Sequence, residues 1–81
     1  MNIIKRVKPL PNFQIELTYS DGEAILVDFK PVIAQGGVFS RLSDPDLFNQ
    51  VKAGGDGRYI EWPNGVDFCA DALRRQAEQK V

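Results

Sequence analysis

The side chains in this sequence that could take part in acid–base chemistry are almost all carboxylates. The chain has eleven Asp and Glu residues, one cysteine and no histidine. General acid–base catalysis usually depends on a histidine, or on two carboxylates whose pKa values are pushed apart. Asp44 and Asp46 form one acidic pair, but they surround Pro45, a pattern typical of the first turn of a helix. We therefore expect no catalytic residue and no enzyme activity.

Metal binding is the second chemistry that these acids could support. Asp21, Glu23, Asp67 and Asp71 offer oxygen ligands, but their spacing does not match the twelve-residue calcium loop. Soft metals prefer His and Cys ligands, which the chain lacks apart from one cysteine. The glycine-rich stretch 54–57 has no Lys-Ser/Thr ending, so it predicts a turn and not a phosphate-binding loop. The sequence predicts no metal and no cofactor.

Cys69 is the only thiol in the chain, so no disulfide within the chain can form. It lies between Phe68 and Ala70, and the nearby acids oppose formation of a thiolate. Because unpaired cysteines are usually packed inside proteins, we expect an inert and buried side chain.

Five of the ten basic residues form two small groups, one of Lys5, Arg6 and Lys8 and one of Arg74 and Arg75. Ten Lys and Arg residues against eleven acids give a formal net charge of -1 and a pI of about 5.2. Such a balance offers no general attraction to a phosphate backbone. We expect no direct binding of nucleic acid.

Trp62 is the only tryptophan and comes directly before Pro63-Asn64-Gly65. Two interpretations are open. In the first, Trp62 packs on the core, and Asp67 caps the last helix or braces the turn. In the second, Trp62 anchors a protein interface, with Asn64, Asp67 and Arg58 as its polar surround. These four residues are the candidates for binding a partner.

The elements that must position these residues begin with the clearest pattern in the chain. Residues 13–20 alternate apolar and polar side chains, which is typical of a strand with one buried face. Asp21-Gly22 and a second β-rich run up to Phe29 follow, so we expect an antiparallel hairpin. Residues 3–10 predict one more strand, ended by the prolines at 9 and 11. Together they form a three-stranded antiparallel meander.

Short elements are expected in the middle of the chain. Residues 30–35 predict a short helix with proline in its first turn, ended by two glycines. Ser43 or Asp44 is expected to cap a second helix, with Leu47, Phe48 and Val51 on its inward face. The stretch 52–57 predicts a turn.

A second hairpin and a helix complete the predicted fold. Residues 58–62 and 66–68 flank Pro63-Asn64-Gly65, in which Asn and Gly are expected to take positive φ. Asp67 or Asp71 is expected to cap a final helix running towards Lys80. Its apolar stripe consists of Ala70, Leu73, Ala77 and Val81.

Composition suits one small α+β domain over residues 1–81. The chain is 43% hydrophobic and 26% charged, close to the averages for globular domains. No signal-peptide pattern and no apolar stretch near ~20 residues is present, so we expect a cytoplasmic protein that does not enter a membrane.

The residues also resemble a known family. The resemblance rests on Lys8-Pro9-Leu10, on 19–23, on 27–29, on Leu47-Phe48, and on 60–68 with Leu73. These are similar to the bacterial domain-of-unknown-function family 2442. The resemblance implies a small α+β fold with an antiparallel sheet, and it supplies no established catalytic residue or cofactor. Genes of this type often stand beside another small uncharacterised protein, which implies a toxin–antitoxin-like pair.

Function is expected to lie in binding. We expect a non-catalytic interaction or regulatory module that binds itself or a small protein partner through a sheet edge or the Trp62 region. The reasons are the lack of catalytic side chains, the small core and the edge strands that two hairpins leave. The alternative is a small-ligand sensor or enzyme accessory protein, with a pocket between the final helix and the sheet near Tyr59, Trp62 and Asp67.

Overall fold

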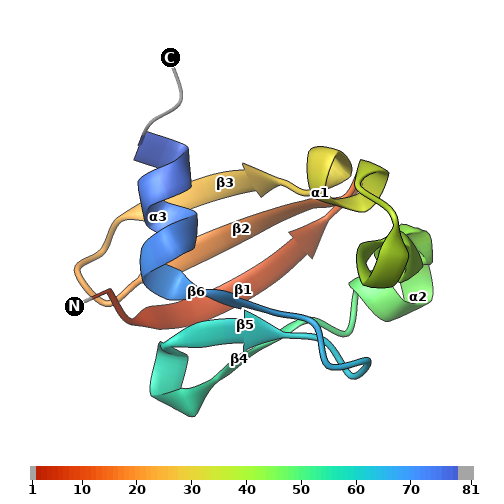
Figure 1. Ribbon diagram of the computed structural model, residues 1–81. Coiled ribbons are helices and arrows are strands. Elements are labelled where there is room, and N and C mark those ends of the chain that lie inside the picture. Colours follow the sequence, from red (N-terminus) through yellow and green to blue (C-terminus); the bar gives the residue numbers. More distant parts are fainter. Residues whose placement is uncertain (1, 79–81) are drawn as a thin grey trace.

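The computed structural model describes residues 2–78 and places them in two antiparallel sheets, with one helix across a face and short helices at one end (Figure 1). The first sheet has the order β1-β2-β3 and the second the order β4-β5-β6. This arrangement confirms the predicted α+β class. The strands are β1 (Ile4–Leu10), β2 (Gln14–Tyr19), β3 (Ala24–Asp28), β4 (Lys52–Gly54), β5 (Tyr59–Glu61) and β6 (Asp67–Cys69).

The helices are short except for the last. They are α1 (Lys30–Ala34), the 3-10 helix η1 (Gly37–Ser43), α2 (Pro45–Phe48), the 3-10 turn η2 (Gly55–Gly57) and α3 (Ala70–Glu78). Within residues 2–78, every helix is too short and too polar to traverse a bilayer.

The first sheet is the predicted meander. Alternation along β2 buries Ile15, Leu17 and Tyr19 and leaves Glu16 exposed on the outer face. Pro9 lies inside β1 opposite Ile15. The proline is tolerated because β1 is an edge strand, so its missing N–H removes no bond from the ladder.

The middle of the chain differs from the prediction in two ways. The second helix is a single turn, Pro45–Phe48, which Asp44 caps by accepting a bond from the Asp46 N–H at 3.0 Å. The segment before it forms η1, which the sequence does not predict because seven residues show no clear helical period. Phe48 and Val51 are buried as expected, although Val51 follows the helix.

The prediction of a turn over residues 52–57 is wrong for its first half. Lys52–Gly54 forms β4 and pairs with Glu61–Tyr59, and only Gly55–Gly57 turns. Lys, Ala and Gly have weak strand propensity, so this strand exists because β5 supplies its hydrogen bonds. The second sheet therefore has three strands and not two.

The second hairpin forms as predicted, with one correction to its turn and one to the helix after it. Gly65 has φ +94°, but Asn64 does not take positive φ. Asp67 lies in β6 and Asp71 is the second residue of α3, so neither stands just before the helix. Ala70 and Leu73 are buried and Ala77 is half-buried. The predicted run to Lys80 and Val81 lies outside the described residues.

One core joins the two sheets and α3. Its aromatic centre is formed by Phe29, Phe48, Trp62 and Phe68, whose neighbouring ring centroids lie 5.3 to 6.1 Å apart. Four of these five contacts are edge-to-face, an arrangement that stabilises a core beyond the burial of area alone. The buried apolar residues are Ile4, Ile15, Leu17, Tyr19, Val27, Phe29, Leu42, Phe48, Val51, Ile60, Trp62, Val66, Ala70 and Leu73.

Candidate functional site

Trp62 belongs to the core and not to the surface. Its side chain is 2% exposed, and its Nε1 donates a hydrogen bond to the Phe48 carbonyl at 3.0 Å. The ring also packs against Phe29 at 5.5 Å. The structure therefore agrees with the first interpretation of Trp62, and this side chain offers no exposed anchor to a partner. Trp62 is buried, so its ring cannot line the pocket that was expected near Tyr59, Trp62 and Asp67.

Two of the other candidates lie together. Asn64 and Asp67 are exposed and line one hollow of about 290 Å³. Its remaining lining comes from Val38 and Phe39 of η1 and from Gly65 and Val66. We call this region, made of Val38, Phe39, Asn64, Val66 and Asp67, the turn surface.

Arg58 is not part of the turn surface. It precedes β5, at the end of that strand opposite to the turn. Its carbonyl accepts a bond from the Ala70 N–H at 2.8 Å, so its backbone ties β5 to the start of α3. The exposed Arg58 side chain is therefore separated from Asn64 by the length of the strand.

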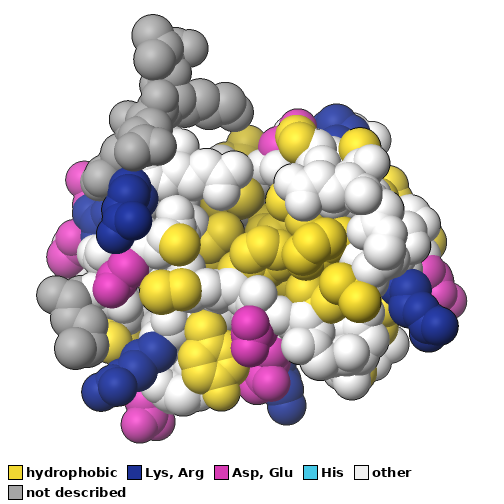
Figure 2. Space-filling model, viewed as in Figure 1, with side chains coloured by type: hydrophobic (Ala, Val, Ile, Leu, Met, Phe, Trp, Pro, Cys, Tyr) yellow, Lys and Arg dark blue, Asp and Glu magenta, His cyan; other side chains and the backbone are white. Residues whose placement is uncertain are grey.

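Val38 is the residue of this surface that the sequence did not reveal. It is 65% exposed, while its neighbour Phe39 is half-buried and lies 6.0 Å from the Phe68 ring. Phe39 thus attaches η1 to the core, and Val38 projects. Figure 2 shows apolar side chains gathered in the middle of the face that it draws, between α3 and the short helices. A single valine in a stretch with no helical or strand period carries no sequence signal of exposure.

The turn that presents Asn64 is held by its own hydrogen bonds. Trp62 N–H donates to the Val66 carbonyl at 2.9 Å, and Gly65 N–H donates to the Trp62 carbonyl at 3.0 Å. The Asn64 Oδ1 accepts from the Val66 N–H at 3.2 Å. Asn64 is exposed, and no hydrogen bond within residues 2–78 engages its side-chain nitrogen.

Acidic residues surround the turn. A second hollow of about 550 Å³ lies on its other side and shares Asn64 with the first. Asp44 and Asp46 line this hollow together with one cation, Arg41. With Asp67, three carboxylates and one guanidinium face this region, which favours basic groups on whatever binds there.

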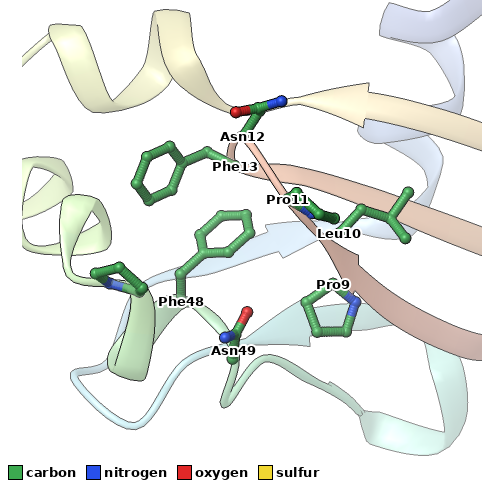
Figure 3. Close-up of a pocket in the computed structure, with 8 residues that line it drawn as sticks. Pro9, Leu10, Pro11, Asn12, Phe13, Phe48 and Asn49 are labelled. Atoms are coloured by element: carbon green, nitrogen blue, oxygen red, sulfur yellow. The ribbon is translucent and has the colours of Figure 1, made fainter.

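A third hollow borders a different face of α2 and is shown in Figure 3. It holds about 420 Å³ between the β1–β2 turn and α2. Asn12 and Phe13 both have positive φ, +65° and +60°. Such a conformation is costly for an aromatic residue, and the Phe13 ring offsets the cost by packing on Phe48 at 5.3 Å. The lining residues are Pro9, Leu10, Pro11, Asn12, Phe13, Pro45, Phe48 and Asn49.

A family model spans this whole arrangement. It matches residues 4–79 and is described as a protein of unknown function, DUF2442. The chain belongs to this family. The match begins at the first residue of β1 and runs through both sheets and the described part of α3, as the resemblance implied. Neither a curated protein nor a solved structure matched the chain.

Two further acids of the DUF2442 chain, Asp21 and Asp71, take part in local contacts. Asp21 lies 2.9 Å from Arg74. The Glu23 backbone N–H, and then Arg74, lower the pKa of Asp21. Asp71 accepts a bond from the Asn2 N–H. Across residues 2–78, no three His, Cys, Asp or Glu side chains gather where they could hold a metal ion.

Cys69 is exposed, so the expectation of a buried thiol is wrong. In the short strand β6, Phe68 is half-buried in the core cluster, and alternation turns Cys69 and Asp67 away from it. The apolar neighbours of the cysteine in sequence therefore do not surround it in space.

Proposed function

We propose that this chain is a non-catalytic interaction module of the cytoplasm that binds a small protein partner through the turn surface. The observation that supports this most is Val38, which stands 65% exposed beside a hollow rimmed by Asn64 and Asp67. An apolar centre with a polar rim is the usual anatomy of a protein interface. Single exposed valines are common, but this one adjoins a concave surface with hydrogen-bonding groups.

The charges around the turn define the partner further. Asp44, Asp46 and Asp67 outnumber Arg41 at the two hollows. We propose a partner segment that places one apolar side chain against Val38 and basic side chains beside the carboxylates. A small protein encoded next to this one, as in a toxin–antitoxin-like pair, is the first partner to test.

The experiment begins with gentle purification from the native host and the intact mass of whatever stays attached. Any stoichiometric protein is then produced separately and titrated against the wild type, Val38→Ser and Asp67→Asn. We expect Val38→Ser to weaken binding at least about tenfold, because the apolar centre is lost. Asp67→Asn is expected to act more weakly and mainly on the association rate at low salt.

Ala53→Ser is the control, because Ala53 is an exposed apolar residue of β4 that lines neither hollow and lies outside both the turn surface and β3. It should bind the same partner as tightly as the wild type. Equal affinity of the wild type and Val38→Ser would contradict a partner site at the turn surface.

A second candidate function is binding of a small ligand in the hollow of Figure 3. The consecutive left-handed residues Asn12 and Phe13 favour it, since strained backbone often accompanies a binding site. A ligand bound only by the folded protein must raise its melting temperature. The check is a thermal-shift screen of metabolites, repeated with Asn49→Ala at the hollow. Unchanged melting of the wild type across the screen would count against this function.

A further inference from the structure

Strand β3 is an open edge of the first sheet. Figure 1 shows it at the border of that sheet with no strand beyond it. The Phe29 N–H donates to Phe13, and the Tyr19 N–H donates to the carbonyl of Glu23. Odd-numbered residues of β3 therefore face β2, and the backbone groups of Ala24 and Leu26 point outward. Within residues 2–78, no hydrogen bond engages those outward groups.

This edge lacks the protection that the other edges have. β1 carries Lys5, Lys8, Pro9 and an irregular register near its start, and all of these block pairing with another chain. β4 and β6 have only three residues each. β3 has five residues, no proline and no Lys or Arg, and it exposes 51% of Leu26.

We propose that two copies of this chain pair through β3 in antiparallel fashion, with Leu26 of each copy opposite Leu26 of the other. The proposal goes beyond the proposed function, because it names a second copy of the chain as a partner at a surface other than the turn surface. The first sheets of the two copies then form one continuous sheet of six strands about a twofold axis.

The sequence of β3 is complementary to itself in this register. Ala24 lies opposite Asp28 of the second copy, so no like charges are opposed. The two Asp28 residues stand at opposite ends of the pairing, roughly 13 Å apart along the strands. At the centre, the two exposed leucines cover each other.

The other face of the sheet supplies a second fit. A hollow of about 280 Å³ lies between the end of β3, α1 and α3, lined by Val27, Asp28, Pro31, Gln76 and Ala77. In the proposed register, Ile25 of the second copy stands directly opposite Val27 on this face. Its half-buried side chain therefore reaches the hollow, and the twofold axis repeats the contact.

The interface is small, because one five-residue edge and three pairs of side chains bury an area near the lower limit for specific association. We therefore expect a dissociation constant on the order of 10 µM. Sedimentation equilibrium from about 1 to 300 µM, with a reducing agent present because Cys69 is exposed, should show a monomer–dimer equilibrium. A wild type that stays monomeric at the top concentration overturns the proposal.

Charge substitutions at position 26 test the register. Leu26→Lys and Leu26→Glu each place like charges opposite each other, and each should raise the dissociation constant of its own dimer at least about tenfold. A mixture of the two variants should regain dimers, since Lys then faces Glu. Dimers that persist in both variants, or a mixture that stays monomeric, overturn this pairing.

A proline provides the backbone test. Leu26→Pro removes the outward N–H but no bond to β2, so the monomer should keep its far-UV circular dichroism and lose dimerisation. If Leu26→Pro does not fold, the Leu26→Lys and Leu26→Glu variants still decide the question.

Val38→Ser should leave the dimer unchanged. Loss of self-association and loss of partner binding are therefore measured with different variants.

Discussion

At the scale of single residues, the indole of Trp62 is fixed by one buried hydrogen bond to the Phe48 carbonyl. The bond joins α2 to the end of β5, two elements that are separated along the chain. The Phe48 carbonyl also accepts from the Val51 N–H at 3.3 Å, so the indole N–H is the shorter of its two donors. The polar atom of Trp62 therefore contributes to stability beside the area that the ring buries.

Trp62→Phe should lower the free energy of unfolding by about 2–4 kcal/mol. The loss combines the shorter of the two hydrogen bonds to the Phe48 carbonyl, which keeps only the Val51 N–H at 3.3 Å, with the space left by the smaller ring. Urea unfolding followed by far-UV circular dichroism measures it. Val38→Ala, at an exposed position, is the control and should change stability by less than about 0.5 kcal/mol. A loss as small as that of the control would show that the bond contributes nothing.

Asp21→Asn should make stability less dependent on pH in acid. The pKa of Asp21 is lowered by the Glu23 N–H and by Arg74, so its folded-state pKa lies below the unfolded value. Its contribution is present above the unfolded pKa and is lost as pH falls through the folded one. The difference in unfolding free energy between the wild type and Asp21→Asn should therefore shrink as the pH falls below the ordinary Asp pKa of about 4. A constant difference below that pKa would disprove the contribution.

Residue roles were only partly predictable from the sequence. The size and apolar character of Trp62 indicated a core position as one of two interpretations, and the structure buries the side chain in the core. The exposure of Val38 and of Cys69 could not be predicted, because both depend on how short, irregular segments are oriented by tertiary packing. Asn64 and Asp67 lie together because both belong to the second hairpin, which the sequence predicted. Arg58 does not join them, because strand β5 separates it from the turn.

At the scale of elements, strong periodicity was informative and weak periodicity was not. The alternating segment 13–20 and the Pro63-Asn64-Gly65 turn predicted both hairpins. β4 was missed because Lys52-Ala53-Gly54 has no strand propensity and pairs only because β5 lies beside it. The helix α2 was placed correctly by its cap but overextended, since propensity alone does not set where so short a helix ends.

The contact between η2 and β1 can be tested with two glycines of nearly equal φ. Gly57 has φ +93°, and a side chain there would meet the Ile4 carbonyl and the Ile3 side chain; Gly65 has φ +94° and open space around it. Gly65→Ala should cost about 1–2 kcal/mol through backbone strain. Gly57→Ala should cost at least about 2 kcal/mol more, because β1 must move.

Chemical denaturation of both variants measures this difference directly. Equal losses would mean that η2 and β1 do not need their close approach.

At the scale of the whole molecule, the two sheets cannot be separated. The Trp62 ring lies 5.5 Å from Phe29, which follows the first sheet, and 5.9 Å from Phe68 of the second. The Tyr19 hydroxyl donates to the Ala70 carbonyl at 2.9 Å and ties β2 to α3. Neither sheet has a core of its own, as expected for a chain of 81 residues.

The chain should therefore unfold in one step. Tryptophan fluorescence reports the centre of the core, and far-UV circular dichroism reports all helices and strands. Their urea transitions should coincide, because loss of either sheet exposes Trp62. Separate midpoints would show that one sheet persists without the other.

The hydrogen bonds of the Trp62–Val66 turn also control how fast Asn64 loses its side-chain amide during storage. An Asn-Gly pair loses its amide when the glycine nitrogen attacks the asparagine side-chain carbonyl. Here the Gly65 N–H is bound to Trp62, and the Asn64 oxygen is bound to the Val66 N–H. Deamidation of Asn64 should thus be slow while the turn is closed and rapid once it opens. The amount of acidic charge variant in a stored sample then records how long the chain has spent unfolded.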